Sequence, residues 1–437
     1  MELIQVGDPG YDDNRTIFNA MIDRKPSVIA LCRTKDEVAE AIRYAREHGL
    51  EIAVRGGGHS VAGMALTEGG LVIDLRHLNH VEVDPKARTA KVQGGATMSN
   101  LDRATEPFGL ATTGGRVSTT GVGGFSLGGG TGWLDRKFGL ACDNLLEAEL
   151  VTADGRFVKA SPKENPELFW ALHGGGGNFG VATELTFRLH PLSTVAMAML
   201  LFQPERGPEM VAKFRDFIEA GSDDVNGAVI YMTGPPEEFV PAHMQGKKTL
   251  AVLVMSAGDP AEIEPMTQLG HEGGMQMELP YADLQCMVDD PPGHRNYWSA
   301  EHLASLPDEA VRAFCDTTNT MIVPSASQGV LFPAGGAAGR ETADYPVPWR
   351  AAPWVVHPFG LWDKASDDER GKAWVRESCA AVKPWSMGSV YLNFIGNEGQ
   401  ARVESGFGAA NYERLKAVKR EFDPRNVFHL NHNISPE

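Results

Sequence analysis

Apolar and polar residues in positions 27–55 follow first a strand pattern, then a helix pattern, then a strand pattern again. Residues 28–32 (VIALC) form a short apolar run of the kind found in buried strands. Thr34 and Glu37 stand three residues apart, which is the spacing of a helix capping box. Apolar residues then recur at helical intervals, at Val38, Ile42 and Ala45. Gly49 ends this helical pattern and LEIAV opens a second strand, so we predict a strand–helix–strand unit that leads directly into RGGGHS.

The rest of the chain divides into regions of different pattern. Strand-like segments recur at GLVID, VEVD, TAKVQGG and EAELVTADG, and the last predicts a hairpin with an Asp154-Gly155 turn. From about 196 to about 385 the chain carries apolar strands, a helix (EMVAKFRDFIEA) and most of the tryptophans, which indicates a second domain. After Pro384 we predict a strand, SVYLNFIG, and then a helix, NYERLKAVKREF. One apolar face of that helix consists of Leu415, Val418 and Phe422.

Charge and cysteine usage limit the classes of partner and compartment. The 437 residues include 57 acidic and 40 basic side chains, for a formal net charge of −17. We therefore expect no nucleic acid and no membrane as partner, because either would need a basic face. The N-terminus lacks the pattern of a signal peptide and the scattered cysteines form no CxxC pair, so we expect a cytoplasmic protein with reduced thiols and no metal site. The cysteines are Cys32, Cys142, Cys286, Cys315 and Cys379.

Forty-nine glycines include three clusters, at 56–58, 114–132 and 173–180. The third contains a literal GxGxxG, but it follows a helical segment and leads into a strand, and residues 197–203 contain no acid. A nicotinamide Rossmann fingerprint needs the opposite order and an acid on the next strand, so we reject that interpretation. A P-loop is absent from the sequence.

The first two clusters have features of a ligand-binding loop. Arg55 precedes the glycines at 56–58, and successive backbone amides in such a loop can form an anion site for a diphosphate. The alternative is a tight turn without a ligand. The second cluster includes Phe125 and Leu127 and is followed by Trp133, residues that a free linker would lack, so we predict an ordered loop packed against a ligand.

The order of the motifs is more specific than any one of them. In chain order they are VRGGGHSVAG, GLVIDL, VQGGATMSNL, TTGGRVSTTGVGGFSLGGGTGWLDRKFGLACDNL, ALHGGGGNFGVATE and YLNF…NYERLKAVKREFDPRNVFHLNHNI. Together they resemble the FAD-linked oxidases of the vanillyl-alcohol oxidase/p-cresol methylhydroxylase (PCMH) superfamily, in the berberine bridge enzyme-like branch. The resemblance covers about 25–195 and 385–437, and the length is similar to that of short bacterial members.

The resemblance implies an α+β, two-domain PCMH-type FAD-binding fold. Residues 1–195 would form the FAD-binding domain, and residues 386–437 would form a berberine-bridge-like segment that completes it. Residues 196–385 would form a substrate-binding domain built on an antiparallel sheet flanked by helices. This sheet would cover the substrate side of the flavin.

His59 holds the place of the histidine that, in this family, forms an 8α-N-histidyl bond to FAD. The electron-poor ring acidifies the flavin 8-methyl group, whose tautomer accepts a neutral imidazole nitrogen. Many relatives add a cysteine tether to flavin C6, in a motif GxCPTVG. Here Val117 stands in the cysteine's place, so we expect no 6-S-cysteinyl bond. The alternative is that His59 packs against the cofactor without a bond.

The resemblance also implies which residues surround the cofactor. Thr120 sits where the residue that controls oxygen access is commonly valine or leucine. The expected cofactor-binding residues are Arg55, Gly56, Gly57, Gly58, His59, Ser60, Val117, Thr120, Gly121, Gly123, Gly124, Ser126, Gly130, Trp133, Gly180, Val181, Asn431 and Asn433. An ordinary C-terminal turn explains the last two nearly as well.

Tyr391 and Asn393 are the expected catalytic residues. Relatives place a tyrosine over the flavin at this YxN position, and on a strand these two side chains would share a face. A tyrosinate base at neutral pH requires its pKa to fall from about 10 to near 7. A nearby cation would supply most of that, and the sequence does not identify it. The alternative is a half-buried strand tyrosine.

The implied function is that of an FAD-dependent oxidase. Its substrate would be an alcohol, an amine or a phenolic secondary metabolite, and hydride transfer to flavin N5 would be followed by reduction of molecular oxygen to hydrogen peroxide. Two alternatives stay open. One is a dehydrogenase that uses another electron acceptor, and the other is a flavin-carrying protein that binds a toxic metabolite and confers resistance.

Overall fold

A four-stranded sheet confirms the predicted strand–helix–strand unit. The computed structural model describes residues 1–290, 292–340 and 344–437. The order of the sheet is β1-β2-β4-β3, with β4 between β2 and β3 and parallel to both. Helix α2 (Lys35–His48) connects β2 to β3, and its Thr34 cap accepts a hydrogen bond from Glu37 N at 3.2 Å. The strands are β1 Glu2–Gln5, β2 Val28–Leu31, β3 Ile52–Arg55 and β4 Leu71–Asp74.

A second, five-stranded sheet is antiparallel and has the order β5-β6-β10-β8-β9. The predicted hairpin joins its strands β8 and β9, with Gly155 at φ 82° in the turn. The strands are β5 Val81–Asp84, β6 Thr89–Gln93, β8 Leu145–Val151, β9 Phe157–Ala160 and β10 Val181–Arg188. A two-stranded pair, β7 (Leu110–Ala111) with β11 (His190–Pro191), lies apart from it.

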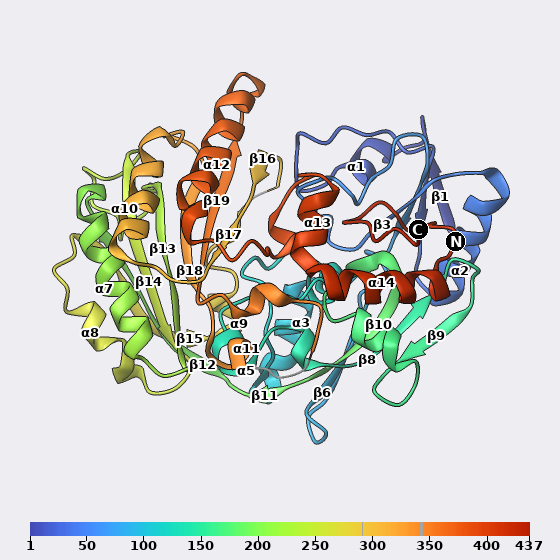
Figure 1. Ribbon diagram of the computed structural model, residues 1–437, viewed down its shortest axis with the longest axis horizontal. Coiled ribbons are helices and arrows are strands. Elements are labelled where there is room, and N and C mark those ends of the chain that lie inside the picture. The colour runs from blue at the N-terminus through green and yellow to red at the C-terminus, as the bar shows by residue number, and fades with distance from the viewer. Residues whose placement is uncertain (291, 341–343) are drawn as a thin grey trace.

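The largest sheet is antiparallel throughout, as the resemblance implies. Its order is β15-β12-β14-β13-β18-β19-β16, and β17 pairs with β19. The strands are β12 Thr194–Phe202, β13 Val225–Thr233, β14 Lys248–Ser256, β15 Gly273–Pro280, β16 Arg295–Trp298, β17 Glu301–Leu303, β18 Gln328–Pro333 and β19 Trp354–Trp362. Helices α7 (Gly207–Ala220), α10 (Asp308–Thr317) and α12 (Asp368–Val382) cover its outer face (Figure 1).

The two faces of this sheet carry different side chains because alternate residues of a strand point to opposite sides. Val229 and Tyr231 of β13 pack with the outer helices, whereas Ile230 packs on the inner face with Val330 of β18. The inner face is directed toward the segment that contains Trp133, which belongs to the same inner cluster. The sheet can therefore cover a site on the N-terminal part of the molecule with every second residue of its strands.

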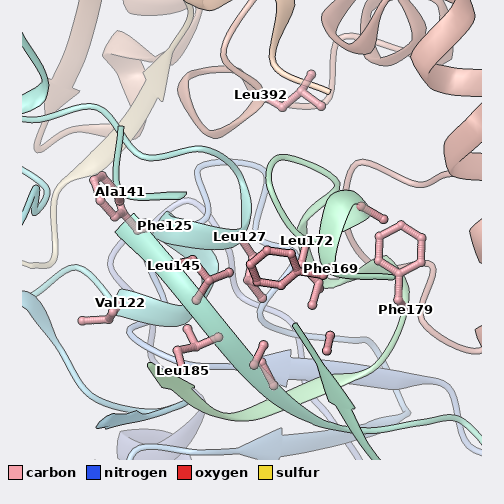
Figure 2. Close-up of a cluster of buried hydrophobic side chains, with 14 of the residues drawn as sticks. Val122, Phe125, Leu127, Ala141, Leu145, Phe169, Leu172, Phe179, Leu185 and Leu392 are labelled. Carbon is pink, nitrogen blue, oxygen red and sulfur yellow. The ribbon is translucent and has the colours of Figure 1, made fainter. Parts of the chain in front are cut away.

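The segment 114–132 is not a simple loop, which corrects the expectation from its glycine content. It contains helix α4 (Val122–Leu127), whose Phe125 and Leu127 pack with Leu145 of β8 in a buried cluster (Figure 2). Leu392 reaches the same cluster from the C-terminal part of the chain (Figure 2). Packing of Val122, Phe125 and Leu127 stabilises a helix in a sequence that its glycines alone would disfavour.

The C-terminal segment agrees with the sequence in its helix and differs in its strand. The predicted helix is α14 (Ala409–Phe422), with Leu415, Val418 and Phe422 buried. The predicted strand SVYLNFIG is instead an irregular segment with a 3-10 helix at Leu392–Phe394. Apolar residues within this segment are buried, so its composition resembles that of a strand. It nevertheless has no partner strand within the described ranges.

Short helices complete the fold. They are α1 Tyr11–Arg15, α3 Met98–Thr105, α5 Asp135–Phe138, α6 Pro166–Ala171, α8 Glu264–Thr267, α9 Tyr281–Leu284, α11 Gly336–Arg340 and α13 Gln400–Phe407. Among the residues that the structure describes, no helix has the length and apolar character needed to span a bilayer.

Candidate active site

A cavity of about 390 Å³ lies between the glycine clusters and the inner face of the large sheet. We call the glycine side, with residues 56–58, 121–124 and 174–177, the floor of the cavity. We call the sheet side the roof. The roof consists of Ile230, Gln328, Val330, Phe332, His357 and Phe359.

The floor is built from backbone brought into close contact. A Cβ atom added to Gly57 would lie 2.3 Å from Gly121 N, so the first and second glycine clusters meet at a distance that only glycine permits. At Gly124 an added Cβ would meet no atom within 4 Å, and a side chain there would extend into open space beside the cavity. The floor is thus a concave backbone surface that larger residues would obstruct or fill.

Most of the residues predicted to bind the cofactor line this cavity. They are Gly56, Gly57, Gly58, His59, Ser60, Val117, Thr120, Gly121, Gly123, Gly124, Trp133, Gly180, Val181 and Asn431. The two predicted catalytic residues, Tyr391 and Asn393, line it as well. Residues from three distant parts of the sequence therefore converge on one cavity.

Arg55 lies outside the lining of the cavity, although its sequence position suggested a phosphate contact. Its guanidinium donates to the carbonyl oxygens of Asn14 and Thr16, the latter at 2.6 Å, and lies 4.0 Å from Asp74. Burial lowers the pKa of Arg55 to about 10. The side chain ties the N-terminal segment to the end of β3, and the local motif could not reveal this because Asn14 and Thr16 are about 40 residues away.

Ser126, Gly130 and Asn433 also lie outside the lining. Ser126 is buried within α4, and Gly130 has φ 83° with its carbonyl accepting from Ala141 N at 2.9 Å. Asn433 is half-buried in the C-terminal segment. Of the two predicted C-terminal asparagines, only Asn431 reaches the cavity.

A buried ion pair holds this C-terminal segment against the third glycine cluster. Lys419 Nζ donates to Asp423 Oδ2 at 2.7 Å and to the carbonyl oxygens of Asn178 and Phe428 at 2.7 and 3.0 Å. Asn178 in turn accepts from Ile434 N at 2.9 Å. These contacts connect α14 to the floor, and a lysine four residues before an aspartate in the sequence gives no sign of them.

His59 projects from the floor as a neutral imidazole. Its ring stacks on Phe18 with centroids 4.3 Å apart, and its Nε2 lies 2.9 Å from Thr119 Oγ1. Burial lowers the pKa of His59 to about 4. Its Nδ1 makes no hydrogen bond to any residue in the described ranges, so one nitrogen is fixed and the other is available to a ligand.

Tyr391 and Asn393 meet although they are not on a strand. Asn393 Nδ2 donates to Tyr391 Oη at 2.9 Å, and Tyr391 Oη lies 3.5 Å from the carbonyl oxygen of Phe125. Burial raises the pKa of the fully buried Tyr391, and the Asn393 hydrogen bond and the charge of Arg116 oppose this rise. Arg116 is thus a candidate for the cation that the sequence could not identify.

The roof contains two polar residues, His357 and Gln328, that were not among the predicted catalytic or cofactor-binding residues. His357 Nδ1 lies 2.8 Å from the carbonyl oxygen of Ser299, which can only accept, so Nδ1 carries the proton and Nε2 carries a lone pair. Burial lowers the pKa of His357 to about 4 and keeps it neutral. His357 and Gln328 are on cavity-facing positions of β19 and β18. Their alternation with outward-facing residues in WVVHPFGLW and QGVLFP is the signal that could have found them.

Four of the buried polar atoms that lack a hydrogen-bond partner within the described ranges belong to residues that line the cavity. Arg116 Nε, Trp133 Nε1, Trp298 Nε1 and Asn431 Oδ1 are buried and have no hydrogen-bond partner among the residues that the structure describes. Buried polar groups are almost always paired, and a ligand in the cavity could supply partners to these four. A ligand with a diphosphate and an apolar ring system, such as FAD, fits the glycine floor.

The cavity offers neither a thiol nor a metal site within the described ranges. The described cysteines are free, and none of them lines the cavity. No group of histidine, cysteine, aspartate or glutamate side chains there could hold a metal ion.

Comparison with known proteins decides the family. A family model described as an FAD binding domain matches residues 26–161, and one described as berberine and berberine like matches residues 390–435. (R)-6-Hydroxynicotine oxidase of Paenarthrobacter nicotinovorans is 31% identical over 449 residues, which cover 100% of this chain and 97% of that protein. The chain belongs to the berberine bridge enzyme-like FAD-linked oxidoreductases. This confirms the family, the FAD cofactor and the oxidoreductase class expected from the sequence.

Solved structures of this family share the fold. 6-Hydroxy-D-nicotine oxidase from Arthrobacter nicotinovorans has a TM-score of 0.88 at 29% identity, with 100% of this chain and 98% of that chain covered. A glucooligosaccharide oxidase from Acremonium strictum, whose flavin is described as 6-S-cysteinyl, 8α-N1-histidyl FAD, has a TM-score of 0.85 at 22% identity, with 100% and 97% covered. These similarities confirm the PCMH-type FAD-binding fold.

Proposed function

We propose that this FAD-linked oxidoreductase is an oxidase that holds its flavin through one covalent bond, to His59, and oxidises an alcohol, amine or phenolic metabolite. When bound, FAD would accept a hydride from a substrate C–H bond at N5 and pass the electrons to oxygen, giving hydrogen peroxide. The protein's part is to bind both molecules, exclude water and accept the substrate proton. The single observation that supports this best is His59, a neutral imidazole at the end of a glycine floor with Nδ1 unpaired among the described residues.

The geometry around His59 favours attachment through Nδ1. Thr119 Oγ1 interacts with Nε2, and the ring is oriented by its stacking on Phe18. A neutral imidazole is the form that can attack an electron-poor carbon, and the low pKa of His59 keeps it in that form at neutral pH. Val117 lines the cavity where relatives carry the second attachment residue, so we expect His59 to be the only tether.

Acid precipitation tests the attachment. Yellow colour should stay with the precipitated wild-type protein, and a peptide containing His59 should carry the mass of FAD. In His59→Ala the colour should move to the supernatant, whereas the exposed His48→Ala control should behave like the wild type. Colour in the wild-type supernatant would refute the covalent bond, and a colourless protein that takes up no FAD would refute the loading of this site with flavin.

Two cavity groups are candidates for accepting the substrate proton. Tyr391 Oη accepts a hydrogen bond from Asn393 Nδ2, and this bond and the charge of Arg116 oppose the effect of burial. The net shift of the Tyr391 pKa is nevertheless upward, opposite to the shift that a tyrosinate base requires. His357 Nε2 has a lone pair and the correct protonation state without any change. Because relatives place a tyrosine over the flavin at this YxN position, we propose Tyr391, with Asn393 as its positioning partner, as the base of the oxidase reaction.

Oxygen use is a separate part of the proposal. Thr120 lines the cavity at the position associated with oxygen access, and threonine matches valine in size. Anaerobically reduced enzyme mixed with air-saturated buffer should reoxidise rapidly and release one hydrogen peroxide per flavin. Slow reoxidation together with rapid electron transfer to a quinone or a dye would instead establish a dehydrogenase.

We also propose that the protein is cytoplasmic and that its domains have the limits 1–195, 196–385 and 386–437. Fractionation of the native host with detection of the protein would test the first. Limited proteolysis followed by mass mapping would test the second, with cuts expected in the connections beside these limits, at residues 192–193 and 386–388.

A further inference from the structure

Arg116 is a buried cation between the floor and the roof of the cavity. Its side chain is 9% exposed. The guanidinium lies over the ring of Phe332 at 4.1 Å from the centroid and over Trp133 at 4.9 Å. Two aromatic rings therefore fix the plane of the guanidinium, and Phe332 belongs to the roof, where the substrate would lie.

The protein leaves this cation incompletely paired. Arg116 Nη2 donates to the carbonyl oxygen of Gly132 at 3.0 Å and lies 3.9 Å from Asp135 Oδ2. Asp135 already accepts hydrogen bonds from Asn226 Nδ2 at 3.0 Å, from Gly132 N at 3.2 Å and from the hydroxyl of Thr131. Arg116 Nε has no acceptor among the described residues, and a buried charged donor without an acceptor is costly unless a ligand completes it.

Of the three other unpaired polar atoms among the described residues that line the cavity, two are donors and one, Asn431 Oδ1, is an acceptor. Trp133 Nε1 and Trp298 Nε1 are buried without an acceptor in the described part of the chain. Asp290 is an acidic group that also lines the cavity, and burial raises its pKa to about 7. A site rich in donors matches a ligand group rich in acceptors.

Aromatic rings form much of the surface beside these groups. Phe359 stacks on Trp298 with centroids 4.2 Å apart, and Phe394 stacks on His357 at 4.2 Å with an interplanar angle of 8°. All four residues line the cavity. Flat, apolar walls of this kind favour a planar ring over a hydrated sugar.

We infer that Arg116 anchors the substrate through an anionic oxygen, a carboxylate or a phenolate, carried on an aromatic ring. The oxygen would accept a hydrogen bond from Arg116 Nε, and the ring would lie against the aromatic side chains of the roof. This rests on the proposed function for the assignment of the site as the substrate site. The binding itself needs no turnover and can be measured on the oxidised holoenzyme.

Calorimetric titration of the oxidised holoenzyme tests the anchor with simple probes. Benzoate should bind at least about tenfold tighter than benzamide, which has the same shape and no charge. Benzoate should also bind tighter than cyclohexanecarboxylate, which has the charge without the flat ring. With 4-nitrophenol, the absorbance band of the phenolate should appear on binding at a pH below the pKa of the free phenol. A preference for benzoate identifies a carboxylate, and a preference for the nitrophenolate identifies a phenolate.

Variants separate the charge from the packing. Arg116→Met should abolish the preference for benzoate over benzamide, and Arg116→Lys should keep part of it. Arg206→Met is the matched control, because Arg206 also lies over a ring, that of Phe202 at 5.1 Å, but outside the cavity lining. Equal binding of benzoate and benzamide to the wild type, with no bound phenolate, would overturn the inference. That result would leave the flavin bond and oxygen consumption unaffected, so it is distinguishable from failure of the proposed function.

Discussion

The floor and the roof of the cavity use opposite parts of the polypeptide. The floor presents backbone, in glycine clusters where Gly57 and Gly121 approach too closely for any Cβ. The roof presents side chains, from alternate positions of β18 and β19 and from Ile230 of β13. A surface made of backbone can hold a constant ligand, whereas a surface made of side chains can change with each substitution. The difference suggests that the floor carries the chemistry common to the family and the roof carries the specificity of this chain.

The largest expected effect comes from obstructing the floor. In Gly57→Ala the new Cβ would lie 2.3 Å from Gly121 N, a backbone atom that cannot move aside cheaply. We expect the flavin content of the purified protein to fall more than tenfold, with a lower melting temperature. Absorbance near 450 nm and differential scanning fluorimetry would measure both. Gly270→Ala is the control, because a Cβ there meets no atom within 4 Å. Full flavin content in Gly57→Ala would show that the two clusters can separate.

The next effect distinguishes the two candidate proton acceptors. Tyr391→Phe removes the hydroxyl that Asn393 contacts, and His357→Gln removes the lone pair of Nε2 in the roof. If Tyr391 is the base, its variant should slow flavin reduction by about 10²–10⁴-fold, and the His357 variant should change it by less than about tenfold. Rapid-mixing measurement of flavin reduction by substrate under anaerobic conditions gives these rates. The reverse ranking would assign the base to the roof, and normal function in both variants would favour a binding protein.

The same division explains what could be predicted from the sequence. The glycine clusters and His59 are local motifs, so their place at the cavity follows from a few adjacent residues. Arg116 and His357 acquire their roles from neighbours that are distant in sequence, such as Phe332 and Ser299. No local pattern shows that one arginine, Arg55, is bound to backbone carbonyls while another, Arg116, keeps a free donor.

Irregular structure was the other obstacle to prediction. The apolar alternation in SVYLNFIG is typical of a strand, yet the segment has no partner strand in the described part of the chain and contains a 3-10 helix instead. Tyr391 and Asn393 still meet, because the turn brings their side chains together at 2.9 Å. The two side chains therefore lie together, as the strand pattern predicted, although the backbone there is not a strand.

A smaller effect should follow from removing one polar group of the roof. Gln328 faces the cavity beside Phe359, and its side-chain amide makes no hydrogen bond to any residue in the described ranges. Gln328→Met keeps the length of the side chain and removes its amide. We expect the KM to rise by roughly 10-fold, equivalent to about 1.4 kcal/mol, with little change in kcat, if the amide binds substrate. Steady-state kinetics would show this, and an unchanged KM would leave His357 as the polar residue of the roof that could contact substrate.

The smallest expected effect concerns the buried carboxyl group of Asp102 in α3, which accepts a hydrogen bond from Gln285 Nε2 at 3.3 Å. Burial raises the pKa of Asp102 to about 7, so the native protein binds a proton that the unfolded chain releases near pH 4. Stability contributed by this proton is present at low pH and is lost as the pH rises toward 7 and above. Asp102→Asn should therefore unfold with a free energy at least about 1 kcal/mol greater than the wild type at pH 8 and nearly the same at pH 4.5.

The pH dependence of this difference separates Asp102 from the buried histidines. Burial lowers the pKa of His302 to about 3 and that of His357 to about 4. The wild type and the Asp102→Asn variant therefore both lose stability as the pH falls below 6.5. That loss is common to wild type and variant and cancels when the two denaturation curves are subtracted. Asp308→Asn is a control with the opposite sign, because Arg215 lowers the pKa of Asp308. Loss of the Asp308 charge should therefore lower the free energy of unfolding at pH 8. If the difference in the free energy of unfolding between Asp102→Asn and wild type stays constant from pH 4.5 to 8, Asp102 is ionised in the folded protein and carries a buried charge.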